Sequence, residues 1–522
     1  MSHEQLSSQA HATGAALHCD LLIIGGGING AGIARDAAGR GLNVVLCERD
    51  DLAQHTSSAS TKLVHGGLRY LEYYEFALVR KALREREILL RAAPHIISPL
   101  RFVMPHEAKT RPAWMIRAGL FLYDHLAKRE FLPASSTIKL ADHVAGAPLK
   151  GGRKVGFVYS DGWVDDARLV VLNALDAHER GATIFTHTSC TDLKREGDQW
   201  RATLLGRHAC TVTARAVVNA AGPWAAQVAA LAPGRSTKAL RLVKGSHIVV
   251  PRLFEHSYAY LFQNSDKRIV FAIPYQDEFT LIGTTDLEYT GDPATVAIQH
   301  DEVDYLCDIA NQYFRMQISK DDVVWSYSGV RPLLDDSAEN ASAVTRDYLL
   351  ECDSDGDGPP LLNIWGGKIT TYRKLAEEAL ALLLPRLNNS APIWTSKHPL
   401  PGGDLEQAGA LVKTASFEGF LRRICKIYPW LPVPLARRYA HAYGSRIKHM
   451  LAGAMALEDL GAELSPGLFE REAKYLCAVE WASSSADILW RRTKLGLYAK
   501  AEHGIELTNW LTRHRHAMLK NT

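Results

Sequence analysis

Residues 20–48 carry the clearest pattern of apolar and polar positions in the chain. Residues 21–24 form a continuous apolar run, as in a parallel strand that is covered on both faces. A glycine-rich turn, a helix of small residues that ends at Gly41 and a second apolar run at residues 44–46 follow. This order predicts a strand, a helix and a second parallel strand, with Glu48 at its end.

The turn has the spacing G-x-G-x-x-G, formed by Gly25, Gly27 and Gly30. These glycines permit a tight turn, the approach of a pyrophosphate and close packing of helix on strand, and a helix N-terminus attracts phosphate. Glu48 is placed to accept hydrogen bonds from ribose hydroxyls and disfavours a 2′-phosphate. A lone motif is compatible with a plain glycine turn, but here the strand, helix and acidic residue follow in order. The pattern therefore predicts a bound dinucleotide, either FAD or NAD.

The next segment predicts loops and two helices. Residues 56–60 are small and hydroxyl-rich, as in a loop that donates hydrogen bonds, and the glycines after His65 let the backbone approach a flat ligand. Apolar positions between residues 71 and 88 predict a helix, and residues 113–126 predict a second, core-facing one. The solvent side of the first helix would carry Arg80, Lys81, Arg84 and Arg86.

Further along, the pattern changes from βαβ units to short strands. Residues 155–192 predict a strand, a helix capped by Asp165 or Asp166, and another strand. The run AVVNAAGPWA from Ala216 is either a second contact with the dinucleotide or a plain strand-to-turn junction. Short β-branched runs over residues 241–290 predict an antiparallel or mixed sheet. A helix at 300–314, a strand near 325–334, a surface turn at 351–360 and a strand, Gly-Gly and helix over 361–384 complete this part.

The C-terminal part predicts a helical domain after a linker at residues 399–403. Its apolar positions are periodic near residues 417–427, 468–481 and 505–519. From Ile393 onward there are 18 Lys and Arg against 12 Asp and Glu, although the whole chain carries a net charge of only +3. These cations suit either a solvated surface or an anionic bilayer, and no nucleic-acid module accompanies them. Three basic clusters carry that hypothesis: Arg422 to Lys448, Arg491 to Lys494, and Arg513 to Arg515.

Composition narrows the class of protein. The eight cysteines show no C-x-x-C pair and no disulfide framework, which favours a reducing compartment. Residues 1–18 lack the features of a signal peptide and resemble a disordered tail. No apolar run reaches the roughly 18 residues of a membrane-spanning helix, and no His/Cys cluster has metal-ligand spacing, so we predict no metal.

Only one strong dinucleotide fingerprint is present, and an enzyme that uses both NAD and flavin would need a second one. One tightly held FAD is the simpler interpretation. Twelve motifs in order then resemble the FAD-dependent (aerobic) glycerol-3-phosphate dehydrogenases. They are IIGGGINGAGIARDAAGRGL, TSSASTKLVHGGLRYLE, RPAWMIRAGL, WVDDARLV, VNAAGPW, KGSHIVVPR, DKRIVFAIP, IGTTD, YSGVRPL, TRDY, GGKITTYRKLAE and LWRRTKLG.

The resemblance implies an α/β (α+β) fold like that of D-amino-acid oxidase, in three parts. A Rossmann-like FAD-binding domain would comprise residues 19–75, 150–235 and 355–390. A mixed-sheet substrate-binding domain would comprise residues 76–149 and 236–354. Residues 398–522 would form an all-helical C-terminal cap, and residues 1–18 the tail.

The resemblance also implies a substrate site over the flavin. Arg69, Tyr70, His247, Arg331 and Arg346 would surround a phosphorylated alcohol, since guanidinium forks bind phosphate oxygens bidentately. For any one of these arginines a structural salt bridge is the alternative.

The chemistry requires a base that accepts the proton of the C2 hydroxyl. Histidine has a suitable pKa for it, and His247 is our candidate, although a strand histidine bonded to backbone would look the same. Arg331 could polarise the forming carbonyl, and Lys368 would favour negative charge at flavin N1/O2.

The FAD contacts expected from the motifs and the resemblance are spread over six segments. They are Ile24, Gly25, Gly27, Ile28, Asn29, Gly30, Glu48, Ser57, Ser60, Thr61, Lys62, Leu63, His65, Gly66, Gly67, Ala221, Gly222, Trp224, Arg331, Gly367, Lys368, Ile369 and Thr370. Of these, His65 is expected to anchor a loop near the ring.

These expectations converge on one function. The chain would oxidise sn-glycerol 3-phosphate to dihydroxyacetone phosphate and pass electrons through FAD to ubiquinone or menaquinone. It would be a cytoplasmic homodimer attached peripherally to the inner membrane. The alternatives are an oxidase that uses O₂ and a non-catalytic flavin-binding redox sensor.

Overall fold

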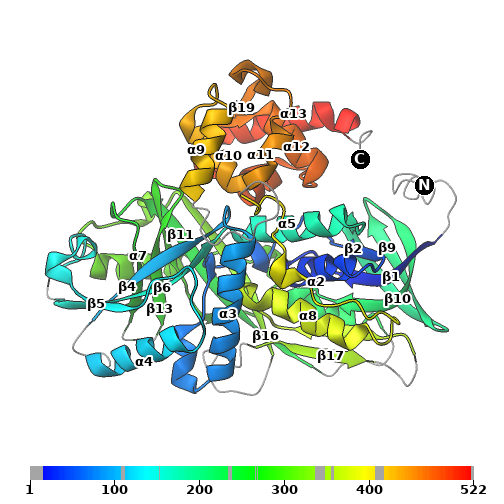
Figure 1. Ribbon diagram of the computed structural model, residues 1–522, viewed down its shortest axis with the longest axis horizontal. Coiled ribbons are helices and arrows are strands. Elements are labelled where there is room, and N and C mark those ends of the chain that lie inside the picture. Colours follow the sequence, from blue (N-terminus) through cyan, green and yellow to red (C-terminus); the bar gives the residue numbers. More distant parts are fainter. Residues whose placement is uncertain are drawn as a thin grey trace.

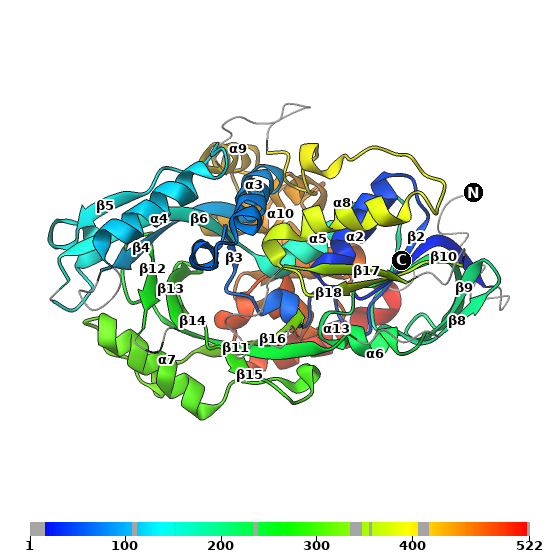
Figure 2. The same ribbon diagram turned by 90° about the horizontal axis from the view of Figure 1, so that it is seen from below.

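The computed structural model describes residues 16–106, 112–151, 153–232, 238–264, 266, 268–334, 347–353, 358–405 and 417–518, with only the backbone for the last four. Figures 1 and 2 show two sheet-based parts side by side, and Figure 1 shows a helical part above them. This arrangement confirms the predicted fold class. Strand β1 (Leu17–Ile24) begins inside the predicted tail, and the rest of that tail up to residue 15 lies outside the described residues.

The first sheet contains the predicted strand–helix–strand unit. Its strands run in the order β17-β18-β10-β1-β2-β7, and β9 continues from β10 to β8. The strands around β1 are parallel, with Leu22 opposite Val45 on one side and Val217 on the other. Its members after β1 are β2 (Val44–Cys47), β7 (Thr183–Phe185), β8 (Thr188–Glu196), β9 (Gln199–Gly206), β10 (Cys210–Asn219), β17 (Leu349–Asp353) and β18 (Leu361–Trp365).

Both faces of this sheet are buried, as the continuous apolar run of β1 predicts. Leu21 and Ile23 pack in the cluster formed with α2 (Ile28–Gly39), α5 (Asp166–Glu179) and α8 (Tyr372–Leu383). Leu22 and Ile24 pack on the opposite side, with residues of β8 to β10. Asp165 is the N-cap of α5, because its side chain accepts the N–H of Arg168.

The second sheet is mixed, as predicted for residues 241–290. Its strands run in the order β15-β11-β14-β13-β12-β4-β6-β3; β16 pairs with β11, β5 pairs with β6, and only β12 and β4 are parallel neighbours. The strands are β3 (Leu63–Val64), β4 (Ile97–Pro105), β5 (Ser136–Lys139), β6 (Val155–Val164), β11 (Leu240–Pro251), β12 (Ala259–Gln263), β13 (Ile269–Tyr275), β14 (Phe279–Gly283), β15 (Leu287–Glu288) and β16 (Trp325–Leu334). Helix α7 (His300–Tyr313) packs on one face.

The membership of the sheets differs from the predicted segments in two places. Strands β3 and β6 pair in the mixed sheet, and β17 pairs in the first sheet, antiparallel to β18. The surface turn predicted at residues 351–360 therefore begins as strand, and residues 354–357 lie outside the described part of the chain. The chain thus passes into the mixed sheet at β3 and β6, two segments that the prediction had placed in the FAD-binding domain.

The two predicted helices of the substrate part exist, but their buried faces differ from the prediction. In α3 (Phe76–Ala92), Arg86 is buried and its Nη1 lies 2.6 Å from Oδ1 of Asp161, so it does not lie on the solvent side. In α4 (Ala113–His125) only Leu120 and Tyr123 are buried, so the prediction of a core-facing helix is wrong. An apolar run thus predicts a helix without specifying how many of its residues are buried.

The C-terminal part is helical apart from a small hairpin of β19 (Glu463–Ser465) and β20 (Leu468–Phe469). Its helices are α9 (Phe417–Ile427), α10 (Val433–Tyr443), α11 (Ile447–Met450), α12 (Glu470–Val479) and α13 (Ala501–Met518). They enclose a core of their own that includes Tyr439, Leu476 and Trp510. None of the helices in the described residues has the length and apolarity needed to cross a bilayer.

Buried ion pairs fix this helical part to the first sheet. Arg492 contacts both carboxylate oxygens of Asp51, at 2.7 and 2.8 Å, and Arg491 contacts the same carboxylate at 2.6 Å. Lys494 lies 3.3 Å from Asp165. The cluster Arg491 to Lys494 therefore faces inward, which corrects its assignment to a membrane surface. Of the cluster Arg513 to Arg515, the last side chain lies outside the described residues.

Candidate active site

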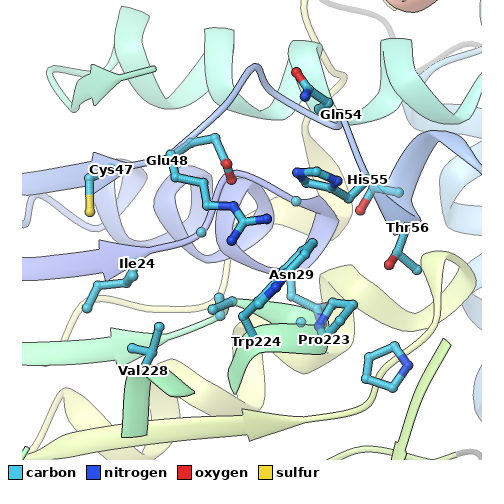
Figure 3. A pocket seen from close by; sticks show the side chains of 18 of the residues that line it. Ile24, Asn29, Cys47, Glu48, Gln54, His55, Thr56, Pro223, Trp224 and Val228 are labelled. Atoms are coloured by element: carbon cyan, nitrogen blue, oxygen red, sulfur yellow. The ribbon is translucent and has the colours of Figure 1, made fainter. Parts of the chain in front are cut away.

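A cavity of about 340 Å³ opens at the carboxyl ends of β1 and β2, where the glycine motif lies. Its volume is in the range of small-molecule sites. Figure 3 shows the side chains of Asn29, Glu48, His55 and Trp224 gathered around it. They come from α2, the end of β2, the loop after it and η5 (Gly222–Trp224), so both sides of the first sheet contribute.

The three glycines of the motif differ in what surrounds them. Gly25 has φ +114°, and a Cβ there would lie 2.5 Å from the carbonyl oxygen of Ala220. A Cβ on Gly30 would lie 1.9 Å from the oxygen of Gly25, so Gly30 lets the helix pack closely. A Cβ on Gly27 would meet only Oγ of Ser57, at 3.1 Å, and would occupy the cavity. Gly222 faces open space on the opposite wall.

Glu48 joins the end of β2 to the glycine turn. Its two carboxylate oxygens accept the N–H groups of Gly26, at 2.6 Å, and Asp50, at 2.9 Å. Burial raises the pKa of this carboxyl, while the two backbone hydrogen bonds lower it. Because each oxygen has a further lone pair, Glu48 can also accept hydroxyl hydrogen bonds from a ribose.

The N-terminus of α2 offers a second set of polar groups. Ile28 donates its N–H to Oγ of Ser57, at 3.0 Å, and Asn29 donates from Nδ2 to the oxygen of Gly366, at 3.1 Å. Oδ1 of Asn29 is buried at the cavity and has no hydrogen-bond partner in the described part of the chain. An orphaned buried acceptor, a glycine cradle and a strand-end carboxylate fit the adenosine and pyrophosphate groups of FAD.

The expected FAD contacts fall into two groups. One group lines the cavity: Ile24, Gly25, Gly27, Ile28, Asn29, Glu48, Ser57, Ala221, Gly222, Trp224 and Gly367. The other group lies outside its lining: Gly30, Ser60, Thr61, Lys62, Leu63, His65, Gly66, Gly67, Arg331, Lys368, Ile369 and Thr370. Pro332 and Gly367, the neighbours in sequence of Arg331 and Lys368, line the cavity.

Sequence reasoning missed Arg49 and His55, which also line the cavity. The guanidinium of Arg49 lies 3.8 Å from the ring centroid of Trp224, and the His55 ring lies 4.7 Å from the same indole. Asp50 holds both residues: its Oδ2 is 3.0 Å from Nε of Arg49 and 2.8 Å from Nε2 of His55. For Arg49, the position directly after the strand-end Glu48 was the available signal, because ligands bind outside the carboxyl ends of such strands.

The hydroxyl-rich loop is held by one buried carboxylate. Asp166 accepts from the hydroxyl of Ser60, at 2.8 Å, and from Nζ of Lys62, at 2.9 and 3.0 Å. Lys62 also donates to the oxygen of Ser58, at 3.1 Å. Its side chain is fully buried in this ion pair, so its contribution to a ligand would be made by its backbone.

The loop around Gly66 is anchored by a second buried network. His65 donates its N–H to Oγ1 of Thr370, at 3.1 Å, and Gly66 donates to the Tyr123 hydroxyl, at 2.8 Å. That hydroxyl donates in turn to Asp161, at 2.7 Å, which also pairs with Arg86. Thr370, Tyr123 and Asp161 thus fix the backbone from His65 to Gly66.

His247 lies on β11 in a buried, cationic environment. Its Nε2 is 3.0 Å from Oγ1 of Thr61, its ring stacks on Tyr327 at 4.8 Å, and Nδ1 has no partner among the described residues. Burial, followed by the charges of Lys62 and Arg331, lowers the pKa of His247 well below its usual value. Burial and these charges therefore favour the neutral imidazole, and they lower its pKa below the value near the working pH that suits a general base best.

The expected phosphate ligands occupy different surroundings. On β16, Arg331 donates from Nη1 to Oδ1 of Asp286, at 2.5 Å, and from Nη2 to Oγ1 of Thr284, at 3.3 Å. Nζ of Lys368 lies 3.8 Å from the ring centroid of Tyr70. Arg69, on η2 (Leu68–Tyr73), makes no ion pair within the described residues. Arg346 lies outside them, so its place beside Arg331 stays a prediction.

Residues 20–373 match the family described as FAD dependent oxidoreductase. The chain belongs to this family. Residues 393–509 match a second family, described as the C-terminal domain of alpha-glycerophosphate oxidase. This FAD-dependent oxidoreductase thus combines the cofactor-binding fold with a separate C-terminal module, and the predicted cofactor is confirmed as FAD.

Relatives of this oxidoreductase match along almost the whole length. A glycerol-3-phosphate dehydrogenase of Pseudomonas aeruginosa is 52% identical over 515 residues, or 98% of each chain. A D-erythritol 1-phosphate dehydrogenase of Brucella abortus is 50% identical over 497 residues, 94% of this chain and 97% of that protein. The solved glycerol-3-phosphate dehydrogenase of Bacillus halodurans, complexed with FAD, has a TM-score of 0.77 at 28% identity, covering 98% of this chain and 94% of that one.

Proposed function

We propose that the protein oxidises sn-glycerol 3-phosphate to dihydroxyacetone phosphate. The observation that carries this proposal is a buried histidine, His247, which has an unpartnered ring nitrogen and lies within the electrostatic reach of Arg331. His247 feels the charge of Arg331, and Pro332, next to Arg331, lines the cavity. A base and a fork of guanidinium donors are what a phosphorylated secondary alcohol requires.

One set of residues would bind the cofactor, and another would bind the substrate and accept its proton. When bound, FAD supplies the acceptor for the hydride that leaves C2. Gly27, Asn29 and Glu48 would hold its adenosine and pyrophosphate, within the sheet-based part assigned above to the cofactor. If Nε2–H of His247 donates to Thr61, then Nδ1 carries the free lone pair and takes the hydroxyl proton. Arg331 would bind the phosphate or the forming carbonyl oxygen.

The direct test is anaerobic reduction of the bound flavin. Glycerol 3-phosphate is expected to bleach the flavin absorbance, whereas glycerol, which lacks the phosphate, leaves it unchanged. Bleaching at equal rates by both compounds would show that no phosphate site exists. A non-catalytic redox sensor would not be bleached by either compound.

A second substrate is favoured by the Brucella abortus relative. D-erythritol 1-phosphate is a longer phosphorylated polyol with the same secondary alcohol next to the phosphorylated end, and that relative is 50% identical to this chain. The two substrates differ only in what lies beyond the reacting carbon. Anaerobic kcat/KM values for both compounds, measured on one preparation, decide between them.

The electron acceptor and the setting are further parts of the proposal. We infer a membrane quinone, ubiquinone or menaquinone, as the acceptor, and a homodimer attached peripherally to the cytoplasmic face of the inner membrane. Exposed apolar and cationic side chains outside the cavity support attachment to a bilayer. Oxygen uptake with and without a soluble quinone analogue separates this from an O₂-using oxidase. Light scattering after gel filtration tests the dimer.

A further inference from the structure

A groove of about 760 Å³ lies between α3 and the end of α4, away from the FAD cavity. Helix α3 contributes one face, whose members recur every three or four residues and so lie on one side of the helix. The groove is lined by Arg80, Arg84, Glu87, Ile88, Arg91, Asp124, His125, Leu126, Ala127, Lys128, Arg129 and Glu130. Cations outnumber carboxylates in this lining.

The carboxylates of the groove are already engaged. Glu130 pairs with Arg91, and Asp124 lies 3.6 Å from Arg129. Glu87 accepts the N–H groups of Glu130 and Phe131, at 2.9 and 3.1 Å. The groove is therefore built around acidic groups that are neutralised within the protein.

Three cations of the groove remain available. Arg80, Arg84 and Lys128 are exposed and make no ion pair with the described residues. Two guanidinium forks one helical turn apart can bind the oxygens of one phosphate group. The groove thus offers a binding site for a phosphate-bearing anion.

The groove adjoins an exposed apolar surface. On α4, Trp114 is 68% and Phe121 64% exposed, and Leu122 lies beside them. His125, at the end of α4, lines the groove and stacks on Phe121 with the ring centroids 4.1 Å apart. Near the start of α3, Tyr74 is also 79% exposed. A soluble anion would leave this apolar surface in water.

We propose that the groove between α3 and α4 binds the headgroup of an anionic phospholipid, with α4 lying against its acyl chains. The charge complementarity and the adjoining apolar face both fit an amphiphile. The inference rests on the proposed attachment to a membrane and names the surface that makes it. Figure 1 places α4 on the side of the molecule opposite α9 to α13, so the helical part faces away from the bilayer.

The experiment is flotation of the FAD-loaded protein with vesicles of phosphatidylcholine alone or mixed equally with phosphatidylglycerol. The groove variant is Arg80→Ala/Arg84→Ala. The matched control is Arg422→Ala/Lys426→Ala, which removes two exposed cations from α9. A third variant, Arg80→Lys/Arg84→Lys, keeps the charge.

We expect the groove variant to bind mixed vesicles about 30-fold more weakly, because each of the two basic residues contributes about fivefold at a membrane surface. The lysine variant should recover part of the binding, because it keeps the charge but not the guanidinium forks. The α9 control should bind as the wild type does, and Trp114→Ala/Phe121→Ala should also lose binding. If the α9 control bound vesicles about 30-fold more weakly and the groove variant bound normally, the helical part would be the membrane-binding surface, and the proposal would be overturned. Displacement by inorganic phosphate at constant ionic strength would identify a soluble-anion site and also overturn it.

Anaerobic reduction by glycerol 3-phosphate is measured on the same preparations. The groove variant is expected to be reduced like the wild type, since Arg80 and Arg84 lie outside the FAD cavity. If the wild type is not reduced but vesicle binding depends on the groove, the substrate assignment fails and the lipid site stands. If flavin reduction is normal and the groove variant binds vesicles as the wild type does, only the proposed lipid site is refuted.

Discussion

At the scale of single residues, His247 determines how the reaction should respond to pH. Because its pKa lies well below the usual value, the imidazole stays neutral until the pH falls to that lowered pKa. We therefore expect the acid limb of the kcat/KM profile well below the pH of about 6.5 at which an ordinary histidine titrates. His247→Gln should reduce kcat by about 100- to 10,000-fold while the bound flavin is retained.

Thr61 provides the accompanying control, because it orients the ring without accepting the proton. Thr61→Val should lower kcat by about 2- to 10-fold, the worth of one hydrogen bond, and Thr61→Ser should restore it. An acid limb that stays in place in His247→Gln would exclude this histidine as the base.

Arg331 is the second residue with a measurable role. Arg331→Ala should lower kcat/KM for glycerol 3-phosphate by about 10- to 100-fold, since hydrogen bonds to charged groups contribute about 1.5–3 kcal/mol. Arg331→Lys should recover part of the loss, because it restores the charge but not the fork. Arg241→Ala, on the neighbouring strand, removes a surface partner of Glu288 and serves as the control. An unchanged kcat/KM in Arg331→Ala would remove this residue from the site.

Residue types with a fixed backbone or chemical role could be assigned from the sequence. The glycines and Glu48 follow from the spacing of one motif. The ion pair of Lys62 with Asp166 could not be foreseen, because it joins residues 104 positions apart. The same holds for Arg331, whose partner Asp286 lies on another segment. Pairing between distant carboxylates and cations depends on the register of the strands, which the pattern leaves open.

At the scale of elements, the N-terminus of α2 and the turn before it form the cofactor site. Gly27→Val should yield protein without flavin, because the added side chain would occupy the cavity next to Ser57. The ratio of flavin to protein absorbance measures this. Gly119→Ala is a matched control, since a Cβ at that position meets nothing within 4 Å. Normal flavin content in Gly27→Val would contradict the site.

The elements show which patterns carry information about burial. The apolar run of β1 predicted a strand covered on both faces, and the structure has one. The run in α4 was taken for a core helix, yet Trp114 and Phe121 are exposed. Periodicity identifies the apolar face of a helix but not what covers it. For α4, that covering is the bilayer in our proposal.

At the scale of the whole molecule, buried ion pairs couple the helical part to the cofactor site. Asp51 binds Arg491 and Arg492, and it lies in the segment whose next residues, Ala53 to His55, line the FAD cavity. Arg168 makes a second buried connection, to Glu480. The position of the helical part is thus linked to the shape of the cavity wall.

This coupling can be measured with Asp51→Asn. The substitution removes the carboxylate that pairs with the buried Arg492, while the half-buried Arg491 keeps its second partner, Asp487. Loss of one partner of a buried ion pair should cost about 3–5 kcal/mol of unfolding free energy. Loss of the wall should also accelerate flavin release, followed by the rise in flavin fluorescence. Glu418→Gln removes an exposed partner of Arg437 and should cost less than about 1 kcal/mol. If the two variants unfold at the same temperature, the ion pairs of Asp51 do not hold the helical part in place.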